Sequence, residues 1–295
     1  MGLKIAIGIA TVGRPQILKV TLELLARQSR PPDRILVCPV SPADIEGINP
    51  VDFGAMITCS SQGLTVQRNT ILSQLRDFDV VVFFDDDFLP DESYLREVER
   101  VFETTTNLVI ATGVLLADGA RSAGLSVAEG LAVLNSARMT PRAATEPSVR
   151  MAAYGCNMAI RLAPVYEHDL RFDPNLPLYS WLEDWDFSGQ IVKVTGGVIV
   201  RYSGMRGVHL GSKNGKQSGV RLGYSQVANP VYIARKGNLP KRRLYGLLHR
   251  NVLANLARCV MPEPHIDRLG RLRGNALAFL DLMRRQCHPR EVEKL

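Results

Sequence analysis

Three consecutive aspartates follow a run of five apolar residues, and this arrangement constrains the fold more than any other feature of the sequence. Residues 80–84 read Val-Val-Val-Phe-Phe, which is typical of a strand that is buried on both faces. Asp85, Asp86 and Asp87 come directly after it. Open α/β sheets bind ligands at the carboxyl ends of their parallel strands. The sequence therefore predicts an α/β protein with an acidic site at a sheet edge.

Hydrophobic patterns elsewhere predict alternating strands and helices. Residues 4–10, 16–28 and 34–40 read as strand, helix and strand, which is a βαβ unit with a parallel sheet. The pattern predicts further strands at 108–116, 153–161 and 197–202, and further helices at 63–76, 91–102, 181–190, 245–260 and 271–286. Residues 117–150 show no clear pattern, and residues 204–223, rich in Gly, Ser and Lys, predict a flexible segment.

Length and composition favour one catalytic domain with an extension. The chain has 295 residues, which fits an α/β domain over 1–210 and a helical extension over 211–295. No apolar stretch approaches the roughly 20 residues of a membrane-spanning helix, and no signal-peptide pattern opens the chain. The five cysteines are widely spaced, which indicates reduced thiols. We expect a cytoplasmic protein.

Charge divides the chain into two parts. Residues 1–200 carry 17 Lys and Arg against 24 Asp and Glu, whereas residues 201–295 carry 19 against 5. The basic part predicts contact with the phosphates of nucleic acid, of anionic lipid or of a diphosphate substrate. Solvated helix faces are the plainer alternative for these side chains.

The aspartate triplet predicts a metal site. Like charges this close repel, and a divalent cation such as Mg²⁺ or Mn²⁺ relieves the repulsion while holding a diphosphate. A solvated acidic loop or a helix cap is the alternative. A second acidic group, Glu183-Asp184-Trp185-Asp186, lies on an expected helix. Asp184 is our candidate for a general base that takes a proton from a hydroxyl acceptor. The alternative is that these acidic side chains only cap the helix or lie on the surface.

The ordered motifs resemble family-2 glycosyltransferases of the GT-A fold, over about residues 3–210. These motifs are Thr11-x-Gly13-Arg14-Pro15, Gly63-Leu64-x-x-x-Arg68-Asn69, the aspartate triplet, Gly155-x-Asn157-Met158-Ala159, Phe172-Asp173-x-x-Leu176 and Glu183-Asp184-x-Asp186. The resemblance implies a Rossmann-like, mostly parallel mixed sheet flanked by helices. It also implies sugar transfer from a nucleotide-diphospho-sugar to a hydroxyl acceptor, with inversion at the anomeric carbon.

The resemblance also implies roles for individual residues. Thr11, Arg14 and Arg68 would border the nucleotide and diphosphate, Asp85 and Asp86 would contact the donor, and Gly155 and Asn157 would border its sugar. Asp87 would bind the metal, with His209 as a late metal or diphosphate ligand. Glu183 would face the acceptor or sugar hydroxyls, and Asp184 would be the general base.

One position departs from the family pattern. The second strand usually ends in an Asp-Asp string that reads the nucleobase, but Cys38-Pro39-Val40-Ser41 stands here. Asp44 is our candidate substitute, and UDP, GDP and dTDP donors all stay open. The basic stretch 206–221, with Lys213 and Lys216, is a candidate lid over the diphosphate, or an ordinary surface loop.

Several readings of partner and activity stay open. We expect a glycan or lipid-linked acceptor in surface-glycan or exopolysaccharide assembly, with peripheral binding of the basic tail at the inner face of the membrane. A homodimer through the C-terminal helices is open. The alternatives are a catalytically silent nucleotide-sugar-binding relative and a basic nucleic-acid-binding protein, although nucleic acid leaves the aspartates unexplained. A processive synthase is disfavoured because its Gln-x-x-Arg-Trp string is missing.

Overall fold

The chain forms two compact units in the computed structural model, which describes residues 2–139, 145–212, 218–260, 263 and 266–295. Unit 1 consists of Met1–Gln62, Val66–Arg171 and Ile191–Gly215, and unit 2 of Gly63–Thr65, Phe172–Gln190 and Lys216–Leu295. This division differs from the sequence-based one, because residues 63–65 and 172–190 fall in unit 2. Residues 172–190, which the motifs assign to the catalytic domain, pack with the C-terminal helices.

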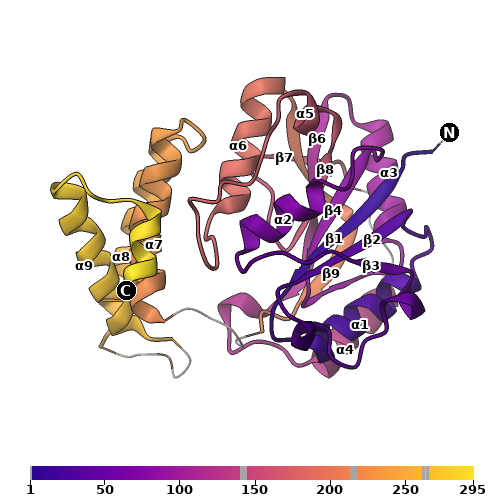
Figure 1. The fold of residues 1–295 in the computed structure, drawn as a ribbon, viewed down its shortest axis with the longest axis horizontal. Helices are drawn as coiled ribbons and strands as arrows, with labels where there is room; N and C mark the ends of the chain where they lie inside the picture. Colours follow the sequence, from indigo (N-terminus) through magenta and orange to yellow (C-terminus); the bar gives the residue numbers. More distant parts are fainter. Residues whose placement is uncertain (1, 140–144, 213–217, 261–262, 264–265) are drawn as a thin grey trace. The chain divides into compact units, whose positions relative to one another are not determined.

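Unit 1 is built on one mixed sheet of nine strands (Figure 1). The main path through the sheet has the order β3-β2-β1-β4-β8-β6-β9-β5, and β7 pairs with β9. Six strands run in one direction, and β5, β7 and β8 run in the opposite one. The strands are β1 (Ile5–Thr11), β2 (Arg34–Pro39), β3 (Ala55–Ile57), β4 (Val80–Asp85), β5 (Phe88–Pro90), β6 (Leu108–Asp118), β7 (Ser148–Arg150), β8 (Asn157–Arg161) and β9 (Val198–His209). The predicted α/β class with a mostly parallel mixed sheet is confirmed.

Helices cover the sheet and alternate with its strands. They are α1 (Pro15–Ala26), α2 (Leu64–Leu72), α3 (Tyr94–Thr104), α4 (Val127–Arg138), α5 (Ala163–Glu167) and α6 (Glu183–Thr195), of which α2 and α6 each span a boundary between the units. Helix α4 was not predicted from the sequence, because residues 117–150 show no clear hydrophobic pattern. A capping box marks its start, because Ser126 and Glu129 exchange side-chain to backbone hydrogen bonds.

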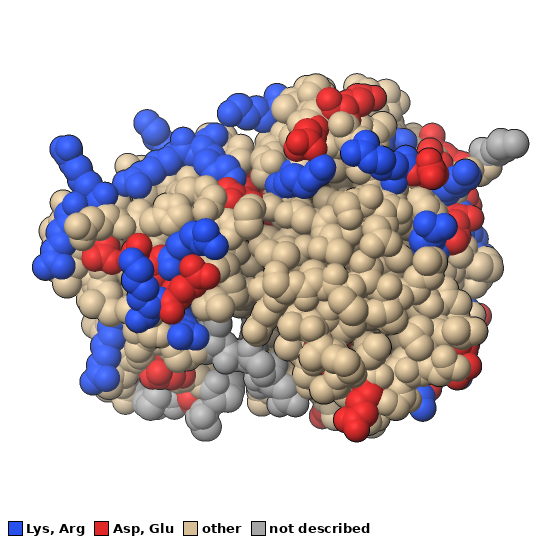
Figure 2. Space-filling model, in the orientation of Figure 1, with Lys and Arg blue, Asp and Glu red and all other residues tan. Residues whose placement is uncertain are grey.

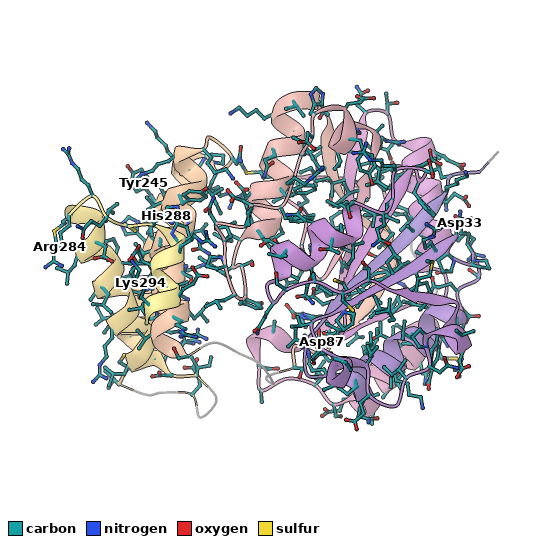
Figure 3. The ribbon with its side chains drawn as sticks, viewed as in Figure 1. Asp33, Asp87, Tyr245, Arg284, His288 and Lys294 are labelled. Carbon is teal, nitrogen blue, oxygen red and sulfur yellow. The ribbon has the colours of Figure 1, made fainter. Side chains whose placement is uncertain are left out.

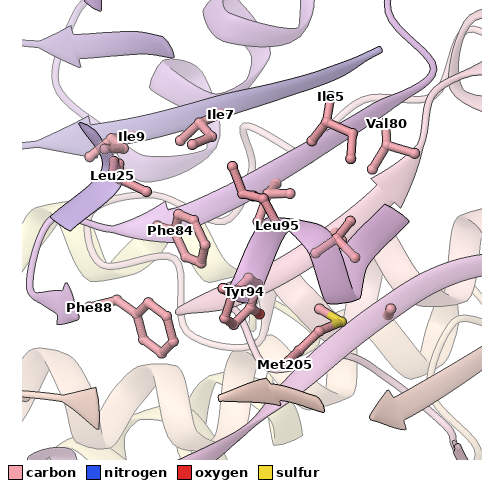
Figure 4. Packing of buried hydrophobic residues seen from close by; sticks show 14 of the residues in the cluster. Ile5, Ile7, Ile9, Leu25, Val80, Phe84, Phe88, Tyr94, Leu95 and Met205 are labelled. Carbon is pink, nitrogen blue, oxygen red and sulfur yellow. The ribbon is translucent and has the colours of Figure 1, made fainter. Parts of the chain in front are cut away.

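The core of unit 1 lies between β1, β4 and the helices α1 and α3. Ile7, Ile9, Val80 and Phe84 are almost fully buried there (Figure 4). The rings of Phe84 and Phe88 stack with their centroids 5.0 Å apart. The packing of β4 on both faces therefore fixes the end of the strand at which the aspartates follow.

Strand β9 is longer than the sequence predicts. Its pairing with β6 is interrupted after Tyr202, where three extra residues bulge out, and resumes at Arg206 to continue to His209. The prediction of a flexible segment is therefore wrong for residues 204–209, and also for residues 219–223, which are helical. The candidate lid over 206–221 is therefore wrong for residues 206–209, which belong to β9, and for 219–221, which belong to α7. Lys213 and Lys216 lie outside the described residues.

Unit 2 contains three long helices, α7 (Gly219–Arg235), α8 (Lys241–Arg258) and α9 (Arg268–Met283). Two of them were predicted, but α7 was not, because Gly219, Gly223 and Pro230 argue against a helix. A buried set of side-chain amides joins the three helices: Asn255 donates to Gln226 and Asn275 over 2.8 and 2.9 Å. None of the described helices combines the length and apolar character needed to cross a bilayer.

Candidate metal and donor site

Asp85, Asp87 and His209 converge at the carboxyl edge of the sheet in unit 1. One ligand atom from each lies within 4.8 Å of the other two. His209 Nε2 is 3.5 Å from Asp87 Oδ1 and 3.9 Å from Asp85 Oδ2. Ligands of an octahedral cation with bonds of about 2.1 Å stand about 3.0 to 4.2 Å apart, so the spacing fits a divalent ion. Two of the three donors are carboxylates, which suit Mg²⁺ or Mn²⁺.

Strand geometry brings these three side chains together. Asp85 ends β4, and a two-residue turn over Asp86 and Asp87 leads into β5. The first residue of β5, Phe88, is paired with His209, the last residue of β9. The backbone N–H of Ser212 donates to Asp87 over 2.7 Å. Figure 3 shows Asp87 at this edge of the ribbon.

His209 is oriented by a carboxylate that the sequence analysis did not identify. Its Nδ1 lies 2.9 Å from Asp118 Oδ1, and Asp118 is the register partner of His209 on β6. Asp118 also accepts from the backbone of Ala120 and from the hydroxyl of Tyr154. A metal-binding histidine commonly contacts a carboxylate through its second nitrogen, which fixes the ring. The sequence could have placed Asp118 at the sheet edge, because it lies two residues beyond the predicted end of a strand, but not beside His209.

At this site the side chains of His209 and Arg14 lie among the carboxylates of Asp85, Asp86, Asp87 and Asp118. Burial disfavours the imidazolium, but the hydrogen bonds to Asp118 and Asp87 raise the pKa of His209 to about 10. Burial likewise opposes ionisation of Asp87, yet the His209 hydrogen bond and the Arg14 charge lower the pKa of Asp87 to about 2. When no metal ion is bound, the protonated ring of His209 offsets part of the negative charge of Asp85 and Asp87. Binding of a metal at Nε2 therefore displaces a proton.

Asp86 is buried and organises the loop after β1. Thr11 Oγ1 donates to Asp86 over 2.7 Å, and the guanidinium of Arg14 pairs with Asp86 at 2.5 Å and with Asp87 at 3.0 Å. Burial raises the pKa of Asp86 well above its usual range, and Arg14 opposes that shift. These contacts place Thr11 and Arg14 at the site, with Arg14 partly exposed.

Arg68, Gly155 and Asn157 form the wall beside Asp85. Arg68 is almost fully buried and donates to the carbonyl of Gly155 over 2.8 Å and to Asp85 over 3.3 Å. Asn157 Oδ1 accepts from Thr112 and Gly113, while its buried Nδ2 has no partner among the described residues. The structure thus brings all three predicted residues to the edge that holds Asp85.

Asp44 is buried, whereas a carboxylate that contacts a nucleobase would have to be exposed. Its oxygens accept from the backbone of Gly13, Val40 and Ser41 at 2.7 to 3.0 Å, and from the Ser41 hydroxyl. Burial opposes ionisation, but these N–H groups lower the pKa of Asp44. Asp44 therefore fixes the loop around Gly13, and a nucleotide contact from Asp44 stays a prediction.

Glu183 and Asp184 open α6 and belong to unit 2. Glu183 is buried, and Asp184 is half-buried with its Oδ1 accepting from the backbone of Trp185. The neighbouring Asp186 is held by Lys236 at 2.7 Å and by Asn238 at 2.8 Å. Lys236 also pairs with Asp173 at 2.6 Å. This Asp173–Lys236–Asp186 bridge fixes the start of α6 against α7.

Known structures share this fold, although no family model and no curated protein sequence matches the chain. The mannosyltransferase PcManGT from Pyrobaculum calidifontis has 14% identity and a TM-score of 0.59, over 96% of this chain and 81% of that one. Glucosyl-3-phosphoglycerate synthase from Mycobacterium tuberculosis has 15% identity and a TM-score of 0.54, over 81% of both chains. GalNAc-T7 has 15% identity and a TM-score of 0.55, over 78% of this chain.

The likeness shows the fold. Unit 1 has the GT-A architecture of nucleotide-sugar transferases. The chain spans only 51% of the length of the GalNAc-T7 structure, and 58% of that of Staphylococcus aureus TarS 1-349.

Proposed function

We propose that this chain is a metal-dependent glycosyltransferase that moves a sugar from a nucleotide-diphospho-sugar to a hydroxyl acceptor with inversion. One observation carries the proposal: Asp85, Asp87 and His209 meet at the carboxyl edge of a GT-A sheet with the spacing of cation ligands. A bound cation would relieve the repulsion between the two carboxylates at the edge where open α/β sheets bind ligands.

The structural neighbours support a nucleotide-sugar donor. PcManGT was solved with GDP-Man and Mn²⁺, and the M. tuberculosis synthase with Mn²⁺ and UDP. We extend UDP- and GDP-sugars to this chain as the first donors to test, with dTDP-sugars as the third group. The oxygen-rich ligand set of the site accommodates either Mn²⁺ or Mg²⁺.

The proposal gives separate roles to individual residues of the chain. A divalent cation held by Asp85, Asp87 and His209 would neutralise negative charge on the departing diphosphate. Arg14 keeps Asp86 and Asp87 in place, and the amide of Asn157 would border the donor sugar. Asp184 removes the proton from the incoming hydroxyl, and Glu183 faces the acceptor or sugar hydroxyls. A single displacement of this kind inverts the anomeric carbon.

Two alternatives predict different outcomes. A catalytically silent relative would bind donor and cation without turnover, and the ligand cluster suits both readings. A nucleic-acid-binding protein is not favoured, because the GT-A likeness covers most of the chain. We place the acceptor among glycans or lipid-linked glycans, in surface-glycan or exopolysaccharide assembly.

The test pairs a binding assay with a transfer assay. Thermal shift with UDP-, GDP- and dTDP-sugars, each with and without Mn²⁺, should show stabilisation of about 2.7 kcal/mol at a ligand concentration of 100 times Kd. The donor so identified is then offered to a panel of glycan acceptors, and NMR of the product reports the anomer. Retention of configuration would overturn the single-displacement mechanism.

Two variants separate the proposed roles. Asp184→Asn should lower kcat by about 10²–10⁴-fold and leave the Mn²⁺ affinity unchanged, because all three metal ligands are elsewhere. Asp87→Asn should abolish the Mn²⁺-dependent thermal shift. Donor binding in the absence of any transfer by the unmodified chain would favour the silent relative, and full activity of Asp184→Asn would reject Asp184 as the base.

A further inference from the structure

Helix α9 exposes an apolar face that carries only positive charge. Leu269, Leu277, Leu280 and Met283 are 53%, 39%, 42% and 74% exposed. Successive members of this set are eight, three and three residues apart, which places them on one side of the helix. Arg273 lies on the same side, and Arg284 follows at its end. Solvated helices rarely expose a leucine stripe, so this face indicates an interaction surface.

Helix α8 repeats the pattern. Tyr245, Leu253 and Leu256 are 55% to 60% exposed, and Val260, just beyond the helix, is 85% exposed. The helix itself contains five Lys and Arg residues and no Asp or Glu. Blue side chains in Figure 2 gather over the part of the chain that Figure 1 labels α8 and α9, and Figure 3 shows Arg284 extending away from the helices.

The exposed arginines are not neutralised within the part of the chain that the structure describes. No ion pair there involves Arg242, Arg250, Arg273 or Arg284, whereas the carboxylates of the region are engaged. Glu263 pairs with Arg258 and Arg268, Asp281 accepts from Tyr224, and Asp267 caps α9.

We infer that the exposed faces of α8 and α9 form a docking surface for an anionic lipid bilayer. Leucine, methionine and tyrosine side chains can enter the headgroup boundary while the flanking arginines meet lipid phosphates. A second copy of this chain fits less well, because its matching face would set arginine against arginine with no carboxylate between them. The inference rests on unit 2 alone and does not depend on the proposed activity.

The experiment is flotation of the full chain with lipid vesicles. Vesicles of phosphatidylcholine with about 30 mol% phosphatidylglycerol should carry the protein at low salt, and pure phosphatidylcholine vesicles should carry little. Raising NaCl to about 1 M shortens the Debye length to about 3 Å and should release most of the protein. Binding that is equal for both vesicle types, or absent from both, would overturn the proposal.

Matched variants test the surface itself. Arg273→Gln with Arg284→Gln should weaken binding about 25-fold, since each arginine near the surface contributes about fivefold. Leu280→Ser with Met283→Ser should lower it by more than tenfold. The control pair on unit 1 is Arg96→Gln with Val51→Ser, at exposed positions, and should bind as the unmodified chain does.

Two further measurements keep the outcome decisive. Circular dichroism must show the same helix content and melting temperature for all variants, because the substituted side chains are on the surface. Light scattering reports mass in solution. A dimer that Leu280→Ser with Met283→Ser converts to monomer, with no vesicle binding by either form, would assign the face to a second copy and overturn the lipid assignment.

Discussion

At the scale of single residues, His209 is held from two directions. Its Nδ1 lies against Asp118, whose position is fixed by β6, and its Nε2 points to Asp85 and Asp87. The ring also meets Tyr154 edge-to-face, with the centroids 6.1 Å apart. An imidazole fixed in this way presents Nε2 to a cation without losing rotational freedom on binding.

Removing the orienting carboxylate should weaken the metal site while leaving all of its ligands in place. Asp118→Asn is expected to lower Mn²⁺ affinity about 10- to 100-fold, because the amide orients the imidazole less well and makes it a weaker ligand. Isothermal titration calorimetry measures the change. Asp77→Asn, at an exposed position on unit 1, is the control and should bind as the unmodified chain does. An unchanged Kd for Asp118→Asn would show that the ring needs no such support.

The sequence could predict some of these residues and not others. The prediction that the aspartate triplet follows a strand is confirmed. Five consecutive apolar residues are typical of a strand buried on both faces, and β4 is such a strand. His209 was expected in a loop, but a bulge extends β9 to it. Asp118 was not identified, because its partner is 91 residues away and nothing in the local pattern pairs β6 with β9.

At the scale of elements, α7 forms against its local propensities. Gly219, Gly223 and Pro230 disfavour a helix. The close packing of α7 nevertheless requires glycine at 223, and at 274 on α9. A Cβ on Gly223 would meet the backbone of Arg271, and one on Gly274 would meet the carbonyl of Val220. The backbones of α7 and α9 therefore approach closely. Packing against α9 stabilises α7, which hydrophobic periodicity alone could not predict.

A methyl group at this contact should separate the two helices. Gly274→Ala is expected to destabilise the protein by about 1–3 kcal/mol, since backbone atoms cannot move aside as a side chain can. Gly246→Ala, on α8 with open space around it, should instead be neutral or stabilising by up to about 1 kcal/mol. Urea denaturation of both variants checks the pair. Equal stability of the two would show that the contact is looser than the structure has it.

At the scale of the whole molecule, unit 2 is assembled from segments far apart in the sequence. The Asp173–Lys236–Asp186 bridge joins residues 172–190 to the C-terminal helices. Motif order assigned Asp173 and Asp186 to the catalytic domain, and no periodicity could show that their partner, Lys236, directly follows α7. Composition did reveal the basic character of residues 201–295, but not which arginines are exposed beside apolar side chains.

The bridge gives stability a dependence on acid. Burial opposes ionisation of Asp173, but the hydrogen bond from Lys236 outweighs it, so the pKa of Asp173 lies below its usual 3.8. A lowered carboxyl pKa contributes stability that is complete above about pH 4 and is lost as the pH falls through the folded-state value. The unmodified chain should therefore exceed Asp173→Asn in stability at pH 7, and the difference should shrink below about pH 4. Urea unfolding at a series of pH values measures it, and a difference that grows on acidification would contradict the bridge.

The interleaving of the two units in the sequence limits how this chain can be recombined with other proteins of the same fold. A hybrid joined once, after residue 210, would separate Lys236 from Asp173 and Asp186 and would give the start of α6 an unfamiliar neighbour. Grafting the C-terminal helices onto another protein of this fold requires that residues 172–190 are transferred with them. The segment that carries Asp184 and the segment that carries the exposed arginines are thus inherited as one piece.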